Sequence, residues 1–245
     1  MLAAVIAAAF VAGAGLQRIA GLGMGLVVAP VLTLVLGPAL GVSLSNAGAI
    51  VTATFVLTSM RKDIDWRAFA RLAPLLVVGS LGGALVVLRA SAAWLEVFIG
   101  VLILLALAST LMASGRIHVR GRLPAIGAGI AGGFMNATAG VAGPAMTIYA
   151  VATRWNHTSF AATLQPVFLL TNATALGAKA FLGAVPSDTG LSWWMWLVAL
   201  VAIAAGVVLG GYASRWVPTR AARRVAITIA AVGGIVTLWR GLSGV

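Results

Sequence analysis

Two short stretches of this chain combine glycine breaks with polar side chains inside otherwise apolar sequence. The first holds Gln17 and Arg18, followed by Gly21, Gly23 and Gly25. Glycine interrupts a helix and leaves backbone N–H groups without partners, and the start of a half-helix carries about half a positive charge. Such groups bind anions in a dry site. The stretch therefore predicts a binding site for a small anion.

The second stretch repeats this pattern later in the chain, with Asn136 and Thr138 beside Gly140 and Gly143. Gln17, Asn136 and Thr138 would supply side-chain donors next to the backbone donors. Close packing is the alternative, because small residues also let membrane helices approach one another. The occurrence of two equivalent clusters at helix breaks favours binding near the midplane of a membrane.

Further polar side chains lie in the apolar segment that follows each stretch. Asn46 follows the first stretch, and Gln165 and Asn172 follow the second. We expect these three amides to line a pathway, whereas nearby serines and threonines hydrogen-bond between helices. Arg18 either meets the anion or gates its path, or else it lies at a hairpin tip or reaches the membrane interface. Lys179, at the end of its segment, is expected to reach the interface.

The sequence offers few residues for catalysis, metal binding or proton transfer. The chain has no cysteine, and its four acidic residues, Asp63, Asp65, Glu96 and Asp188, lie in loops or at the ends of apolar runs. No carboxylate is therefore placed within a span to relay protons or to bind a cation. No nucleophile–base pair and no metal-ligand cluster can be identified. We expect no catalytic residue, no metal and no cofactor, and hence no enzyme.

The amino-acid composition predicts the kind of structural elements that position these residues. The 245 residues are 62% apolar and 8% charged, with a net charge of +12. A soluble domain carries about 25% charged residues, so only lipid can shelter this much apolar surface. The same figures exclude a disordered chain and a nucleic-acid binder. We expect an all-α, multi-pass integral membrane protein, with single crossings at residues 42–59, 69–88, 95–113, 160–178, 191–213 and 225–239.

Two longer apolar runs, residues 2–39 and 123–153, are broken in the middle by the glycine stretches. The stretches match each other at an offset of 119, and Leu81-Gly82-Gly83 matches Leu209-Gly210-Gly211 at an offset of 128. We therefore expect two internal repeats, each a broken or re-entrant helical segment plus three transmembrane helices. The first membrane repeat is residues 1–113, the second is residues 123–245, and a basic cytoplasmic linker, residues 114–122, joins them.

The basic residues indicate how the repeats are oriented. Eleven of the sixteen lie in three loops, within residues 61–71, 116–122 and 215–224. Short basic loops stay in the cytoplasm. If each broken segment enters and returns, all three loops share that face and the repeats are inverted. A parallel duplication with eight crossings is the alternative. We favour the inverted form, a transporter architecture that binds substrate where broken helices meet; whether the broken segments are re-entrant or cross twice stays open.

The broken segments also resemble a known family. The run Gly21-Leu-Gly-Met-Gly25, followed by Pro30, and the weaker copy Gly140-Val-Ala-Gly-Pro144 are similar to those of the sulfite exporter TauE/SafE family of permeases. The likeness covers essentially the whole chain. It implies a bacterial inner-membrane permease for sulfite, a sulfonate or a related organosulfur anion. Met24 and Ala142 depart from the family's usual glycines, which leaves the particular substrate open.

Together these features predict a permease that binds a small anion at glycine-broken helices. Because the cell interior is negative, an anion leaves downhill by about 2.3 kcal/mol per charge per 100 mV, so we expect export without a coupling ion. An anion channel, a transporter of another small metabolite and a non-transporting scaffold are the alternatives. The expected partners are the anionic substrate and the lipid bilayer, without nucleic acid; a homo-oligomer is left open.

Overall fold

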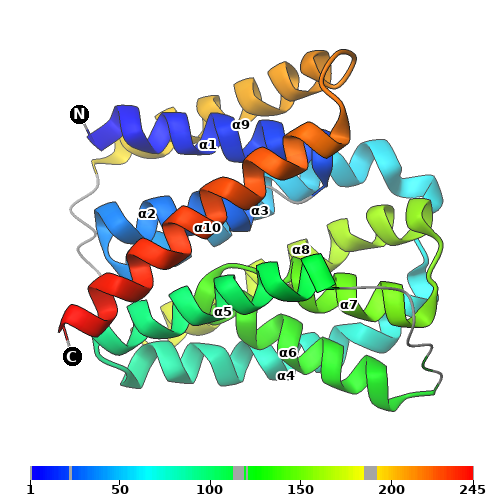
Figure 1. Ribbon diagram of the computed structural model, residues 1–245, viewed down its shortest axis with the longest axis horizontal. Coiled ribbons are helices and arrows are strands. Elements are labelled where there is room, and N and C mark those ends of the chain that lie inside the picture. Colours follow the sequence, from blue (N-terminus) through cyan, green and yellow to red (C-terminus); the bar gives the residue numbers. More distant parts are fainter. Residues whose placement is uncertain (1, 22–23, 113–118, 120, 185–191, 245) are drawn as a thin grey trace.

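The computed structural model describes residues 2–21, 24–112, 119, 121–184 and 192–244. The regular secondary structure of these residues is helical. Figure 1 shows these helices in one bundle, with both chain termini at the same end. Within the described residues, five helical segments are long and apolar enough to cross a membrane: α1 (Leu2–Ala20), α3 with the turn after it (Pro38–Asp63), α4 (Trp66–Arg89), α9 (Trp193–Ala213) and α10 (Thr219–Gly244). This agrees with the predicted all-α membrane protein.

The first long apolar run is divided in two, as the glycine pattern predicted. α1 ends beside Gly21, which adopts a left-handed conformation (φ 73°) and donates its N–H to the Gln17 carbonyl at 2.8 Å. A short π-helix, η1 (Met24–Val28), then leads into α2 (Ala29–Leu36). The helix ends here because glycine reaches a positive φ without the steric cost that a side chain would add.

The second long run is divided in the same way. α6 (Leu123–Ala139) ends at Gly140 (φ 72°), and α7 (Gly143–Thr153) begins three residues later with Pro144 in its first turn. Proline suits that position because its missing N–H would have no helical partner there. The remaining helices are α5 (Ala92–Met112) and α8 (His157–Phe181).

The chain reverses direction at the first break. In Figure 1, α1 runs from the end that holds the termini toward the opposite end, and α2 lies back toward the end where the chain began. The α3–α4 and α9–α10 turns lie at the end opposite the termini and carry the basic residues within 61–71 and 215–224. Two of the three basic loops therefore share one end of the bundle. The linker at 114–122 lies largely outside the described residues.

Glycine lets several helix pairs pack backbone to backbone. α4 packs on α6, and α9 packs on α1. A methyl group at any of four glycines in these pairs would collide with a backbone carbonyl of the facing helix, so the close approach depends on the missing side chain. The contacts are Gly79 to Ile130, Gly83 to Phe134, Gly206 to Val11 and Gly210 to Gly15. α5 packs on α10, and α3 packs on α8 between the pairs.

Polar side chains gather inside the bundle, whereas large apolar ones face outward. The buried polar residues include amides and hydroxyls of α3, α6 and α8, while apolar side chains on α4, α5, α9 and α10 are exposed. An apolar outer surface of this extent requires lipid. Lys179 departs from expectation: protein covers it completely, and its ammonium has no partner among the described residues, so it does not reach the interface.

Candidate functional site

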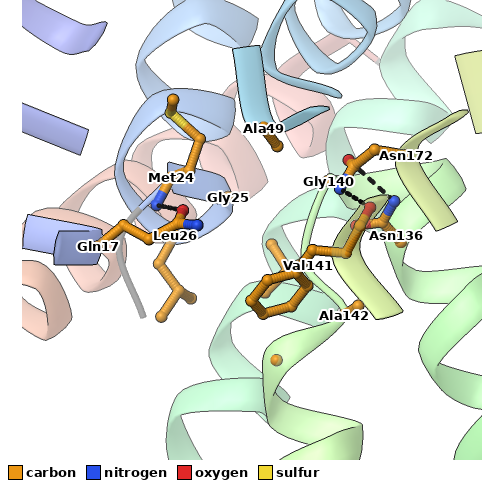
Figure 2. A pocket seen from close by; sticks show the side chains of 12 residues that line it. Gln17, Met24, Gly25, Leu26, Ala49, Asn136, Gly140, Val141, Ala142 and Asn172 are labelled. Atoms are coloured by element: carbon orange, nitrogen blue, oxygen red, sulfur yellow. Dashed lines mark hydrogen bonds between the residues drawn. The ribbon is translucent and has the colours of Figure 1, made fainter. Parts of the chain in front are cut away.

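A small cavity, the central pocket, lies where the two helix breaks meet. Its volume is about 30 Å³, which is space for roughly two water molecules. Figure 2 shows Gln17 and Met24 on one side of it and Asn136 and Asn172 on the other. The lining residues are Gln17, Met24, Gly25, Leu26, Ala49, Asn136, Gly140, Val141, Ala142, Gly143, Phe168 and Asn172. Both predicted glycine stretches therefore line one cavity.

Gln17 supplies the first wall of the central pocket. It lies in the last turn of α1 and is only 4% exposed. Its Oε1 accepts the backbone N–H of Met24 at 3.2 Å, so the side chain holds the start of η1 against the end of α1. Its Nε2 has no partner among the described residues. A buried N–H donor without an acceptor costs free energy, so a bound acceptor would stabilise this site.

Two asparagines form the opposite wall. Asn136 Nδ2 donates to Asn172 Oδ1 at 3.1 Å, and Asn172 Nδ2 donates to the Phe168 carbonyl one turn earlier in α8, at 2.7 Å. Both asparagines are at most 2% exposed. This hydrogen-bonded pair links α6 to α8 at the level of the second break. The wall is thus rigid and polar.

The backbone completes the electrostatics of the pocket. Gly25 and Leu26 lie in the first turn of η1, and Ala142 and Gly143 lie at the start of α7. N–H groups in the first turn of a helix lack intrahelical partners and carry the positive end of the helix dipole. The two breaks also touch, since Gly25 packs against the Gly140 carbonyl. Two helix starts and a free amide donor therefore face one small space, which suits an anion.

One predicted pathway residue, Asn46, and one predicted donor, Thr138, do not line the central pocket. Asn46 is fully buried behind Gly140, and neither atom of its amide group has a partner among the described residues. Thr138 donates its hydroxyl to the Phe134 carbonyl of its own helix at 2.8 Å. Gly23 falls outside the described residues. The structure therefore brings Gln17, Gly25, Asn136, Gly140, Gly143 and Asn172 together around one cavity.

A second, larger cavity, the basic vestibule, adjoins Gln17 on its other side and has a volume of about 670 Å³. Arg18, Gly21 and Gln165 line this cavity and not the central pocket, and Gln17 lines both. Met60 at the end of α3 also lines it, as do residues of the α7–α8 turn and the start of α10. The vestibule therefore opens toward the end of the bundle that carries the basic turns.

The sequence reasoning missed several residues of these cavities. Arg154 and His157, at the α7–α8 turn, and Arg223, near the start of α10, line the vestibule. Arg223 belongs to a basic cluster that indicates how the chain is oriented in the membrane. Nothing in the sequence distinguishes it from its basic neighbours as a residue that lines a cavity. Phe168 and Ala49 line the central pocket, and apolar residues in an apolar span carry no sequence signal for such a role.

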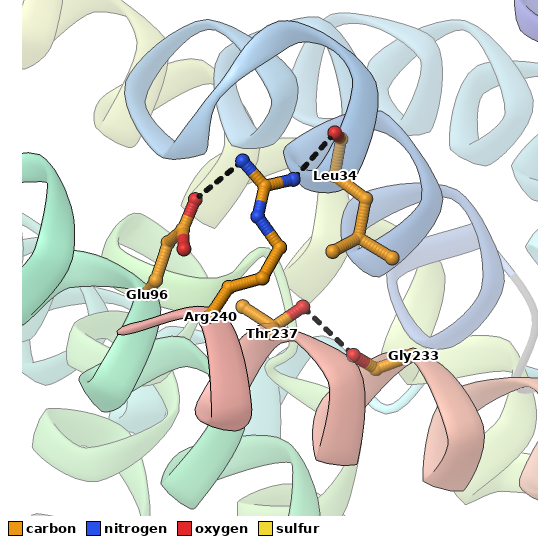
Figure 3. Close-up of polar contacts among 5 residues, drawn as sticks. All are labelled: Leu34, Glu96, Gly233, Thr237 and Arg240. Carbon is orange, nitrogen blue, oxygen red and sulfur yellow. Dashed lines mark hydrogen bonds and ion pairs between the residues drawn. The ribbon is translucent and has the colours of Figure 1, made fainter. Parts of the chain in front are cut away.

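The opposite end of the bundle is held by a three-way contact, the Arg240 bridge (Figure 3). Arg240 Nη2 of α10 lies 3.5 Å from Glu96 Oε1 of α5, and its Nη1 donates to the Leu34 carbonyl of α2 at 2.7 Å. The Glu96 side chain is 9% exposed and that of Arg240 48% exposed. The bridge ties the returning arm of the first break to the α5–α10 pair.

Comparison with known proteins agrees with this picture. The model of the family described as sulfite exporter TauE/SafE matches residues 5–237 of the 245. No curated protein and no solved structure matches the chain. The family consists of membrane transporters and not of enzymes, in keeping with the apolar outer surface of the helix bundle. A match over nearly the whole length is decisive: the chain belongs to the sulfite exporter TauE/SafE family of membrane transporters.

Proposed function

We propose that this protein exports a small sulfur anion, with sulfite as the first candidate and a sulfonate head group as the second, across a bacterial inner membrane. The observation that carries the proposal is the central pocket, where Gln17 Nε2, which has no partner among the described residues, faces a space shared by the starts of η1 and α7. Family membership supports sulfur anions as the class. The proposed ligands are Gln17, Asn136, Asn172 and the backbone N–H groups at both helix starts.

The size and charge of the pocket favour a small oxyanion. About 30 Å³ accommodates roughly two waters, which a sulfite ion or the head group of a sulfonate would replace. No aspartate or glutamate lines the central pocket or the vestibule among the described residues. An anion therefore meets donors without a repelling carboxylate. The membrane potential favours its exit by about 2.3 kcal/mol per charge per 100 mV.

We infer that the two halves are inverted repeats, and the helix contacts support this. The α4–α6 contacts Gly79–Ile130 and Gly83–Phe134 correspond to the α9–α1 contacts Gly206–Val11 and Gly210–Gly15. The partners in α1 and α6 differ by 119 in both contacts, which is the offset of the sequence repeat. The glycines in α4 and α9 differ by 127, one less than the sequence match of Gly82 with Gly210 suggests.

In the α5–α10 pair, too, the contacts of one helix correspond to those of the other. A methyl group at Gly100 would lie 2.8 Å from the Gly234 carbonyl, and one at Gly241 would lie 2.8 Å from the Ala93 carbonyl. Gly241 follows Gly100 by 141 residues, and Gly234 follows Ala93 by the same number. Such reciprocal contacts are expected where a two-fold axis relates the halves.

The topology can be tested at two turns that correspond in this scheme. In the cysteine-free chain, Ser91→Cys in the α4–α5 turn and Val217→Cys in the α9–α10 turn are both at exposed positions. Inverted repeats place them on opposite membrane faces, so an impermeant maleimide should label only Ser91→Cys from outside the cell. Labelling of both cysteines from one side would contradict the inverted arrangement.

The two ends of the bundle support alternating access as the mechanism. The basic vestibule opens toward the end with the basic turns, which the positive-inside rule assigns to the cytoplasm. The Arg240 bridge holds the other end together. We infer a state open toward the cytoplasm, from which export requires the bridge to release while the vestibule closes.

The function can be tested with the purified protein in liposomes loaded with sulfite. We expect saturable sulfite release that an interior-negative potential accelerates. Gln17→Ala should reduce release at least tenfold, because it removes the free donor and the contact with Met24. Thr237→Val, which removes a buried hydroxyl that bonds within α10, is the matched control and should transport normally. Release that does not saturate would indicate a channel, and release that ignores the potential would contradict anion export.

A further inference from the structure

The basic vestibule gathers positive charge from three separate elements. Arg18 lies in the last turn of α1, Arg154 at the end of α7 and Arg223 near the start of α10. His157, at the start of α8, lines the same cavity. None of the three arginines forms an ion pair with the described residues. Charges of one sign that line a cleft focus the electrostatic field and raise the local concentration of the opposite ion.

The backbone that carries two of these arginines is fixed by packing. The Arg18 Cβ lies 3.1 Å from the position that a Gly210 side chain would occupy, which places the end of α1 tightly on α9. Arg154 has a left-handed backbone (φ 55°), which is uncommon for a residue with a side chain. Its N–H donates to the Val151 carbonyl at 3.2 Å, and the next N–H, from Trp155, donates to the Ala150 carbonyl at 2.9 Å.

Aromatic rings hold the turn that follows Arg154. The ring centroid of Trp155 lies 6.0 Å from that of Tyr149 and 5.7 Å from that of Phe160, so the end of α7 and the start of α8 share one cluster. Aromatic pairs at such distances stabilise a packed arrangement beyond the area they bury. Arg154 therefore sits on a braced turn at the rim of the cavity, and not on a loose loop.

We propose that the vestibule is a second anion site, a capture site in which Arg154 and Arg223 hold an oxyanion before it passes Gln17 into the central pocket. This rests on the proposed function, because it assigns a step to the same substrate. Gln17 lines both cavities and so forms the boundary between the two sites. The volume of about 670 Å³ exceeds that of the central pocket more than twentyfold, so the anion is held here with its water.

A capture site predicts an effect on KM and not on the maximal rate. Everted membrane vesicles expose the cytoplasmic face, and uptake of ³⁵S-sulfite into them measures entry through the vestibule. We expect Arg154→Gln combined with Arg223→Gln to raise KM on the order of tenfold at low ionic strength. The maximal rate should stay within about twofold. At about 0.5 M of an inert salt, screening should reduce the difference in KM to about twofold or less.

Two matched variants separate capture from a general change in charge or fold. Arg224→Gln removes one positive charge, half of what the double variant removes, from the neighbouring residue of α10, which is exposed and does not line the vestibule, so its KM should match that of the wild type. Arg154→Lys combined with Arg223→Lys keeps both charges that focus the field, and the anion is held with its water, so KM should stay within about twofold. A double glutamine variant that behaves like Arg224→Gln at both salt concentrations would overturn the capture site.

Binding to the purified protein in detergent keeps the two proposals distinguishable. Titration with sulfite should reveal a tight site and a weaker, salt-sensitive one, and only the weaker site should disappear in the double glutamine variant. Binding of this kind without transport by the wild type would refute export while supporting the capture site. Transport with unchanged binding in the double variant would refute the capture site while leaving export in place.

Discussion

Gly25→Ala is the sharpest test of the central pocket, because the substitution adds one methyl group where the two breaks touch. The new Cβ would overlap the Gly140 carbonyl oxygen and would lie 3.1 Å from the Gly140 carbonyl carbon and 3.5 Å from the Val141 Cα. All three neighbours are backbone atoms, so no flexible side chain can give way. Overpacking of this kind costs about 1–3 kcal/mol, unless the breaks separate by on the order of an ångström.

Either response damages the site. A pocket of about 30 Å³ holds roughly two waters, so a shift of that size changes its volume by a large fraction and displaces the donors from a bound anion. We expect sulfite flux to fall at least tenfold, because donor geometry matters at the sub-ångström level. The assay is flux in liposomes together with thermal unfolding in detergent, which reports the cost in stability.

Gly82→Ala is the matched control for this prediction. Gly82 lies inside α4, and a methyl group there would meet no atom within 4 Å. Alanine should stabilise that helix by up to about 1 kcal/mol and leave flux unchanged. If Gly25→Ala transports sulfite and unfolds like Gly82→Ala, the two breaks do not form a close-packed binding site and the reasoning fails.

Three further predictions concern the walls of the site and the far end of the bundle. Asn136→Ala leaves Asn172 Oδ1 without its donor, so the free energy of unfolding should fall by about 1–3 kcal/mol, measured by chemical denaturation. Gln17→Glu replaces the free donor with a carboxylate that repels anions, so sulfite binding by calorimetry should weaken at least tenfold; unchanged affinity would exclude Gln17 as a ligand. Arg240→Gln releases α2 from α10, so a single cysteine at Ala49 should react faster with an external maleimide than in the parent Ala49→Cys protein.

The helix breaks could be predicted from the sequence, because their cause is local. Gly21 and Gly140 adopt positive φ, which disfavours any other residue, and Pro144 marks the start of the next helix. The predicted positions of the helix ends were less accurate. The run expected at 225–239 belongs to α10 (Thr219–Gly244), since hydropathy detects the apolar middle of a helix and misses charged turns that extend beyond the lipid.

The members of the site were only partly predictable, because sequence gives the depth of a residue and not the face it occupies. The Thr138 hydroxyl bonds within its own helix, and Asn46 lies behind Gly140. Arg154 follows an apolar run as one basic residue among several, and only the packing of the α7–α8 turn places it at the cavity. Lys179 likewise looked like an interface residue until neighbouring helices proved to cover it.

The pairing of α1 with α9 and of α6 with α4 has a consequence for biosynthesis. The partner of α1 emerges only after residues 21–192 have been made, which takes roughly 10 to 30 s at ordinary synthesis rates. During that time the glycine face of α1 rests against lipid or the insertion machinery, so the newly made first half waits as an open intermediate. Two fragments divided within residues 114–122 should therefore each be degraded when made alone and become stable transporters when made together.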